Sequence, residues 1–515
     1  MSGYHVIAAG HELTAQAAEE ILRAGGNAFD AAIAALAAAC AAEPVLASLG
    51  GGGYVLALPA SGRARVYDFF VQTPSHCLPL EDLDFYPIEA NFGTTTQEFH
   101  IGRGTIATPG MIAGMFRLHE DLARLPMRDL FAPAVQWCRE GVAISEFQAY
   151  LFDVVKPTYL ASPACRKIFT SAEDPQRLVT GGEVLQQLDL ADCLEILAIE
   201  GSDLFYRGEM AAQLTDPQHV GGQLQRRDFE NYQVTVSEPL SVDLPGVTLL
   251  TNPPPSSGGI LTAFALGLFA DSELGKIDPK GNEYLVRLAA SLEATHKQRM
   301  DVAAAGPLEA RQILDPELMQ RYRAEVLGQA QASRGTTHIS IIDAAGNLAS
   351  VTTSNGEGSG VIIPGTGIVM NNMLGEEDLH PLGFQRWTPN QRMTSMMMPS
   401  ALVWPDTTRI ATGSGGSNRI RSALLQVISQ LVFYQASPEQ AVQAPRIHWE
   451  QGLLSIEGGF DMERLGALLE AFPKHQIWQE LNMFFGGAHT VRNGPKGADG
   501  CGDPRRAGVL RIVAA

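Results

Sequence analysis

The chain has 515 residues, of which 45% are hydrophobic and 18% are charged, and this composition excludes an intrinsically disordered protein. The formal net charge is −19 and no stretch is rich in lysine and arginine, which excludes nucleic-acid or anionic-membrane binding as the main function. The length allows two or three domains, or one large one.

The N-terminal segment has no basic region and reaches His11 and Glu12 within a few residues, so it lacks the pattern of a signal peptide. The most apolar stretch, 31–42, lies between Asp30 and Glu43. It is shorter than the roughly 20 residues that a bilayer-spanning helix needs. We therefore expect a core helix there and a cytoplasmic location.

The sequence implies no cofactor and no metal site. The six cysteines form no C-x-x-C pair and no Cys/His group of zinc spacing, so we expect reduced, mostly buried thiols. They are Cys40, Cys77, Cys138, Cys165, Cys193 and Cys501. His448 and His489 also lack partners at metal-ligand spacing.

The first hundred residues predict two helices followed by a β-hairpin. The helices span 14–42, with Thr14 as N-cap and a break at 25–27. Strands are predicted at 54–58 and 65–69, joined by a turn at Ser61-Gly62.

The middle of the chain is mostly helical in pattern. The segment 75–105 resembles a loop, and helical periodicity then runs from 111 to about 270, interrupted by a β-like stretch at 234–249. The proline-rich segment 253–259 is predicted to be an ordered loop, with a helix from Ile260. Helical periodicity resumes at about 284 and ends before residue 335.

After residue 335 the pattern changes to short β-branched runs. Residues 336–343 and 348–353 alternate polar and apolar side chains around a turn, which predicts a hairpin and, taken alone, has only a structural meaning. A polar glycine-rich loop follows at 354–360. Residues 412–419 predict a tight turn into a helix, whose N–H groups form an anion or oxyanion site. Without a lysine, this turn is not a nucleotide-binding loop.

These motifs, in this order and spacing, resemble the γ-glutamyltranspeptidase family over nearly the whole chain. The matching stretches are Gly25-Gly26-Asn27-Ala28 with Asp30-Ala31-Ala32, Leu49 to Gly53, Thr108-Pro109-Gly110 with Ala113-Gly114, Pro253 to Gly259, Thr336-Thr337-His338, Asn371-Asn372, Gly413 to Arg419, Ala444-Pro445-Arg446 and Asp503-Pro504-Arg505.

The resemblance implies the α+β fold of the N-terminal nucleophile hydrolases, a four-layer αββα sandwich. It also implies a proenzyme that cuts itself between Gly335 and Thr336. The products would be a large chain, 1–335, and a small chain, 336–515. Both would stay associated, because they form one intertwined domain.

The resemblance makes Thr336 the catalytic nucleophile. Cleavage frees its α-amino group, whose ordinary pKa of about 7.7–8.0 suits a general base acting on the neighbouring hydroxyl. The hydroxyl would attack an amide carbonyl, and the resulting acyl-enzyme would pass its acyl group to water or an amino compound. The family's oxyanion hole corresponds to the backbone N–H groups of Gly416 and Ser417.

Four further residues match substrate-binding positions of the family. Ser354 resembles the hydroxyl residue that assists the nucleophile. Asn355 resembles a substrate-contacting asparagine, although here it stands one position earlier. Glu376 replaces an aspartate that binds the substrate α-amino group, and Ser395 matches the first of two serines that hold the α-carboxylate.

Several residues depart from the family pattern. Phe70 stands where an arginine usually clamps the α-carboxylate, and a phenylalanine cannot make that charged contact. Met396 replaces the second serine and Met373 replaces a glutamine. The segment 378–392 is shorter than in relatives with a lid loop. Arg103 could substitute for the missing clamp, but a structural arginine is the simpler interpretation.

The sequence therefore predicts a self-processing threonine amidohydrolase that cleaves γ-glutamyl amides by hydrolysis, transfer or both. One alternative is an acylase of the same mechanism, acting on an amide without an α-carboxylate. Another is a non-processing binding homologue. We expect Met396, Met397 and Met398 to line core or pocket, and His338 to pair locally within its strand.

Overall fold

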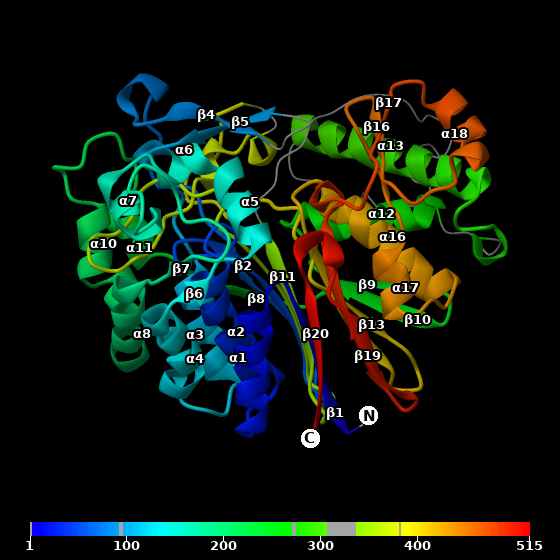
Figure 1. Ribbon diagram of the computed structural model, residues 1–515, viewed down its shortest axis with the longest axis horizontal. Coiled ribbons are helices and arrows are strands. Elements are labelled where there is room, and N and C mark those ends of the chain that lie inside the picture. The colour runs from blue at the N-terminus through cyan, green and yellow to red at the C-terminus, as the bar shows by residue number, and fades with distance from the viewer. Residues whose placement is uncertain (1–2, 92–95, 270–273, 306–335, 381–382) are drawn as a thin grey trace.

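The computed structural model describes residues 3–91, 96–269, 274–305, 336–380 and 383–515. Two β-sheets face each other and helices cover their outer faces, which gives the predicted four-layer αββα order (Figure 1). Within the described residues, no helix is both long enough and apolar enough to cross a membrane.

The first sheet has seven strands within the described residues. Their order is β20 (Val509–Ala514), β1 (Tyr4–Ala9), β11 (Thr337–Ile342), β12 (Leu348–Ser354), β2 (Gly52–Leu58), β3 (Arg65–Phe69) and β8 (Thr235–Ser237). The predicted hairpins β2–β3 and β11–β12 are both confirmed. Strands from either side of residue 335 alternate in this sheet, so the two segments share one hydrogen-bonded framework.

The second sheet has six strands within the described residues and runs in the order β19-β18-β14-β13-β10-β9. The strands are β19 (Gly497–Cys501), β18 (Gly487–Gly494), β14 (Arg409–Gly415), β13 (Ser400–Val403), β10 (Val247–Thr251) and β9 (Leu240–Leu244). The β-like stretch predicted at 234–249 therefore contributes to both sheets.

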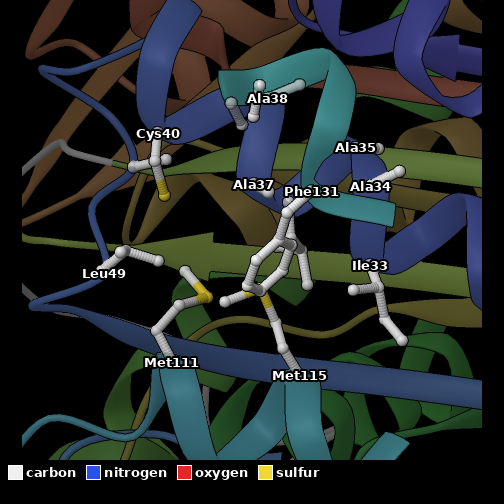
Figure 2. Close-up of a cluster of buried hydrophobic side chains, with 14 of the residues drawn as sticks. Ile33, Ala34, Ala35, Ala37, Ala38, Cys40, Leu49, Met111, Met115 and Phe131 are labelled. Carbon is white, nitrogen blue, oxygen red and sulfur yellow. The ribbon is translucent and has the colours of Figure 1, made fainter. Parts of the chain in front are cut away.

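One outer layer consists of α1 (Glu12–Arg23), α2 (Ala28–Ala42), α3 (Met111–Leu122), α4 (Met127–Glu140) and α8 (Leu188–Glu200). Every side chain of α2 is buried, since its alanines allow neighbouring elements to approach closely. Figure 2 shows Phe131 of α4 and Met115 of α3 packed together beside this helix. The predicted core helix is thereby confirmed.

The predicted N-cap of the first helix is wrong. The helix begins at Glu12, and the Nδ1 atom of His11 accepts a hydrogen bond from Leu13 N at 3.1 Å. Thr14 lies inside the helix, where its hydroxyl donates to the Glu43 carboxylate at 2.7 Å. A long-range partner, which local sequence does not reveal, thus decides the role of Thr14.

The other outer layer contains α12 (Ser257–Phe269), α13 (Asn282–Ala305), α16 (Arg419–Phe433) and α17 (Pro438–Gln443). Helix α12 begins three residues earlier than predicted, because Ser257 N and Gly258 N both donate to the carbonyl of Ser395. The helical periodicity predicted beyond residue 305 lies outside the described residues.

The prediction that residues 75–105 form a loop is wrong in part. They contain a hairpin of β4 (Tyr86–Asn91) and β5 (Thr96–Ile101). The remaining helices and strands lie at the periphery. They are α5 (Glu146–Val154), α6 (Lys156–Tyr159), α7 (Pro163–Phe169), α9 (Asp203–Tyr206), α10 (Glu209–Leu214), α11 (Arg226–Glu230), α18 (Gly466–Ala471), β6 (Val142–Ala143), β7 (Val184–Leu185), β15 (Ile447–Glu450), β16 (Leu453–Ile456) and β17 (His475–Ile477).

A histidine and a glycine fix how the two sheets meet. The His338 ring hydrogen-bonds with the hydroxyls of Thr352 and Ser340, at 2.8 and 2.9 Å, so its predicted local pairing is confirmed. A Cβ atom on Gly413 in the facing sheet would lie 2.2 Å from this ring. Only glycine allows this approach, which brings the end of β14 close to the start of β11.

Candidate active site

Thr336 lies immediately before β11 and is 4% exposed. Its carbonyl oxygen accepts a hydrogen bond from Arg506 Nη1 at 3.1 Å. A Cβ atom on Gly415 would lie 2.2 Å from the same oxygen, so the end of β14 packs directly against Thr336. Gly335, the other half of the predicted cleavage site, lies outside the described residues.

The end of β12 brings Ser354 opposite Thr336, and Glu376 borders the turn that follows Ser354. Thr337 pairs with Thr353 across β11 and β12, which places Ser354 opposite Thr336. The Ser354 hydroxyl accepts a hydrogen bond from Gly356 N at 3.1 Å. A Cβ atom on Gly356 would lie 2.6 Å from Glu376 Oε1, so this carboxylate borders the same turn.

Asn355 is fully buried, and both polar atoms of its side-chain amide lack a hydrogen-bond partner among the described residues. A Cβ atom on Gly51 would lie 3.1 Å from its Oδ1. Such unsatisfied buried amides are rare in proteins and often have a functional explanation. The residue therefore lies next to Ser354 with unused hydrogen-bonding capacity.

The predicted oxyanion residues form the turn between β14 and α16. Gly416 and Ser417 have φ values of 121° and 47°, so the chain reverses sharply there. Their carbonyls accept hydrogen bonds from Arg419 N and Ile420 N at 2.9 and 3.0 Å, which starts the helix. The turn directly follows Gly415, which packs against the Thr336 carbonyl. The oxyanion role of Gly416 and Ser417 stays a prediction.

Ser395 is not joined to these residues by any contact in the described part of the chain. Its hydroxyl accepts a hydrogen bond from Met397 N at 3.1 Å. Its carbonyl accepts hydrogen bonds from the first two N–H groups of α12. Met396 is buried, and its sulfur accepts a hydrogen bond from Ser257 Oγ at 3.7 Å. Met397 and Met398 are buried too, which confirms the expected lining role.

Phe70 occupies an apolar, fully enclosed position. It is 1% exposed, and its ring stacks on Tyr54 with the ring centroids 5.8 Å apart. Next to it lies Arg392, which donates to the Phe70 carbonyl and pairs with Asp68 at 3.4 Å. The Arg392 guanidinium also stands 4.6 Å from the ring centroid of Tyr232. The positive charge of Arg392 is thus paired within the protein.

Arg103 lies at the start of the short helical turn η2 (Arg103–Thr105) and is half-buried. Its backbone N–H donates to the Asp84 carboxylate at 2.9 Å, and the attraction of Asp84 partly offsets the lowering of its side-chain pKa by burial. These contacts are consistent with the structural interpretation of Arg103. Met373 is buried, and its carbonyl is 3.1 Å from His380 Nε2.

A buried charge network supports the turn that carries Arg506. Asp503 pairs with Arg446 at 2.7 Å and with Arg505 at 3.2 Å. Arg505 also pairs with Glu457 at 2.6 Å. Burial alone would raise the pKa of Asp503, but the two arginines and backbone N–H donors hold it at about 2. The motifs Ala444-Pro445-Arg446 and Asp503-Pro504-Arg505 therefore meet in space.

Three buried histidines predict an acid-sensitive fold. Burial lowers the pKa of His489 and of His380 to about 4, and that of His338 well below its ordinary value. The unfolded chain binds protons at these sites below about pH 6.5, before the folded chain does. The free energy of unfolding should therefore be greatest above pH 6.5 and decrease as the pH falls toward 4.

This prediction is tested by the thermal midpoint of the purified protein between pH 7.5 and 4.5. The midpoint should decrease steadily below pH 6.5, and His380→Phe should make that decrease less steep. His219→Ala, which removes an exposed imidazole, should leave the slope unchanged. A midpoint that is constant over this range would contradict the assignment.

Sequence reasoning missed two site features. Arg392 reaches Phe70 from 322 residues away, and Arg506 reaches Thr336 from 170 residues away. The Asp503-Pro504-Arg505 motif was the only signal near Arg506. Among the described residues, no group of three or more histidine, cysteine, aspartate or glutamate side chains is arranged to hold a metal ion.

Comparisons with known proteins identify the family of the chain. The family model described as Gamma-glutamyltranspeptidase matches residues 14–513. A glutathione hydrolase proenzyme of Bacillus subtilis is 27% identical, covering 86% of this chain and 80% of its own length. An acylase ACY 1 proenzyme of a Pseudomonas species is 30% identical, covering 88% and 84%.

Solved structures show the same arrangement. The crystal structure of a cephalosporin acylase from Bacillus halodurans superposes with a TM-score of 0.83 at 25% identity, covering 99% of this chain and 96% of that one. A γ-glutamyltranspeptidase from Pseudomonas nitroreducens, in complex with L-DON, superposes over 62% of this chain and 92% of that one, with a TM-score of 0.51 at 26% identity.

Proposed function

The chain belongs to the γ-glutamyltranspeptidase family, and from this premise we propose that it is a self-processing threonine amidohydrolase that cleaves γ-glutamyl amide bonds. The observation that carries the proposal is the position of Thr336, held between Arg506, the end of β14 and the end of β12. The match to a glutathione hydrolase proenzyme supports a γ-glutamyl substrate.

The proposed reaction begins with the precursor. The Thr336 hydroxyl attacks the carbonyl of Gly335, and the peptide bond between Gly335 and Thr336 breaks as the ester forms, which frees the α-amino group of Thr336. Water then hydrolyses the ester, which leaves a carboxylate on Gly335 and restores the Thr336 hydroxyl. Chains 1–335 and 336–515 then stay together, since strands of both alternate in one sheet.

In the mature enzyme the α-amine takes the proton of the Thr336 hydroxyl as the oxygen attacks the amide carbonyl. The N–H groups of Gly416 and Ser417 stabilise the negative charge on the carbonyl oxygen. The amine then protonates the leaving nitrogen, and an acyl-enzyme remains. Water or an amino compound attacks this ester and restores the free hydroxyl.

Glu376 is proposed to bind the α-ammonium of the substrate. Its carboxylate borders the Ser354–Gly356 turn, opposite Thr336, where a γ-glutamyl group would place its amine. Asn355 adds an amide with unused hydrogen-bonding capacity at the same turn. Ser354 is proposed to hydrogen-bond the nucleophile and to assist processing, and Ser395 to face the α-carboxylate.

A second candidate is an acylase whose substrate lacks the α-carboxylate. Phe70 and Tyr54 form an apolar pair where the family places an arginine, and the neighbouring Arg392 is engaged by Asp68. The match to an acylase proenzyme is consistent with this alternative. A third hypothesis is that the chain is a binding homologue that does not process itself. It predicts a single uncut chain on a denaturing gel.

A set of p-nitroanilides distinguishes the two enzymes. The γ-glutamyl anilide carries both the α-amine and the α-carboxylate, the glutaryl anilide lacks the amine, and the 4-aminobutyryl anilide lacks the carboxylate. The γ-glutamyl enzyme should cleave the first compound with the highest kcat/KM. The acylase should cleave the 4-aminobutyryl or an unsubstituted butyryl anilide at least as well. Cleavage of none of them, by a correctly processed protein, would contradict both substrate assignments.

The variant Phe70→Arg tests whether this position sets the choice. A charge-assisted contact with the α-carboxylate contributes about 1.5–3 kcal/mol, so the γ-glutamyl to 4-aminobutyryl ratio of kcat/KM should rise about tenfold or more. Phe70→Leu, which stays apolar, should not raise it. An unchanged ratio in a folded and processed Phe70→Arg protein would show that position 70 does not select the substrate.

The cytoplasmic location expected from the sequence stays a prediction. Cell fractionation with antibody detection of both chains tests it.

A further inference from the structure

Arg506 ends the short helical turn η8 (Pro504–Arg506) and is 2% exposed. Its Nη1 atom donates a hydrogen bond to the Thr336 carbonyl at 3.1 Å. Glycines make room for it, since Cβ atoms on Gly415 and Gly487 would lie 3.1 Å from Nη1 and 2.2 Å from Cδ. The backbone is thus shaped to admit this guanidinium beside the nucleophile.

The charge of Arg506 is not neutralised by an ion pair. The adjacent Arg505 and the nearby Arg446 each pair with buried carboxylates, whereas Arg506 pairs with none in the part of the chain that the structure describes. Its Nε and Nη2 atoms also lack hydrogen-bond partners there. Burying a charge without a partner costs several kcal/mol, so a buried cation at this place calls for a functional reason.

The charged groups that act on Arg506 come from four elements. Arg419 at the start of α16 repels it, while Asp503 before η8, Glu357 after β12 and Glu43 after α2 attract it. Burial and Arg419 lower the pKa of Arg506 to about 10, so it remains protonated at neutral pH. His338 and His489 are neutral there and add no charge.

We propose that Arg506 is a positioning residue for the nucleophile, which fixes the Thr336 carbonyl and keeps the neighbouring α-amine in its uncharged form. The α-nitrogen lies roughly 3 Å from the carbonyl oxygen of its own residue, so Nη1 of Arg506 lies within about 6 Å of the amine. A nearby positive charge disfavours protonation of an amine. The amine can therefore act as a base at lower pH than a free N-terminus would.

This inference rests on the proposed function, because it requires a free amine at Thr336. The direct test uses the unmodified protein labelled with [15N]threonine, in which Thr336 supplies the only free threonine amine after processing. The 15N shift of that amine should titrate at least about half a pH unit below the ordinary range of about 7.7–8.0. Titration within or above that range would overturn the inference.

Two variants separate charge from structure. Arg506→Met removes the cation and should move the acid limb of the kcat/KM profile to higher pH by about one unit. Arg506→Lys keeps a positive donor and should leave that limb in place, even where kcat decreases. Arg492→Met serves as control, because it removes an arginine that is about one third exposed and pairs with Asp499. It should change neither the acid limb nor kcat.

The outcomes distinguish the two proposals. Absence of a Thr336 N-terminus in the unmodified protein would contradict the proposed function itself. A processed enzyme whose acid limb is the same in Arg506→Met, or moves equally in Arg506→Lys, would contradict only the role of Arg506. Should Arg506→Met remain uncut, the titration of the unmodified protein decides the question.

Discussion

Replacement of Thr336 by alanine is expected to leave a single uncut chain of 55.3 kDa without amide-cleaving activity. The hydroxyl is the proposed nucleophile of both reactions, on a residue whose carbonyl contacts Arg506 and Gly415. Denaturing electrophoresis and a p-nitroanilide assay measure the two effects. Turnover should fall to the background rate, because the covalent route is lost altogether.

Thr336→Ser is the matched control, since it keeps the hydroxyl and the α-amine. It should still be cut and should retain measurable turnover. Thr353→Ala removes a hydroxyl that donates to the Gly52 carbonyl at 3.0 Å on the neighbouring strand, and it should also be cut. An active, two-chain Thr336→Ala protein would show that another residue is the nucleophile.

Asp503→Asn is expected to destabilise the folded protein by about 3–5 kcal/mol, because it leaves two buried guanidinium groups without their shared carboxylate. Asp503 is fully buried between Arg446 and Arg505, and it also accepts a hydrogen bond from Ala488 N at 2.8 Å. The change also loosens η8 and thus the contact from Arg506 to Thr336. Thermal unfolding and the extent of processing measure both effects.

The matched control is Asp499→Asn, on β19, the strand that ends just before Asp503. Asp499 pairs with Arg492 at 2.7 Å, but both side chains are more than a third exposed. The expected loss is therefore below about 1 kcal/mol. If Asp503→Asn and Asp499→Asn lower the free energy of unfolding equally, the proposed contribution of the buried network to stability is contradicted.

The Asp503 carboxylate makes the stability of the protein depend on pH at strongly acidic values. Because the pKa of Asp503 is held at about 2 in the folded protein, its contribution is complete above its ordinary pKa and is lost as the pH falls toward 2. The buried histidines act at higher pH, between about 6.5 and 4. The free energy of unfolding is thus expected to decrease in two separate pH ranges as the solution is acidified.

The parts of the fold that the sequence predicts are those that short-range chemistry determines. The hairpin 337–354 follows from alternation around a turn, and the core helix 28–42 follows mainly from the apolar run 31–42. The hairpin 86–101 is not predicted because Pro87 disfavours a strand, and because the alternation of Tyr86, Ile88 and Ala90 with polar residues is short. The strand Tyr4–Ala9 was not predicted either, since its partners β11 and β20 lie more than 300 residues away.

The candidate site shows the same difference between features of one continuous segment and contacts between distant segments. Thr336 and the turn at Gly416 each belong to a continuous motif, and the structure packs the end of β14, which leads into this turn, against Thr336. Contacts made by single side chains across the fold cannot be predicted from spacing. Arg392 at Phe70 and Arg506 at Thr336 are two such contacts, because each depends on how distant strands and loops pack.

The central claim is that the chain cuts itself to expose Thr336 as nucleophile and base. Intact mass measurement and N-terminal sequencing of the purified, untreated protein test it most directly. The account predicts two associated chains, one ending at residue 335 and the other beginning with Thr336. A single chain of 55.3 kDa that still cleaves an amide substrate, or a new N-terminus at another residue, would contradict it.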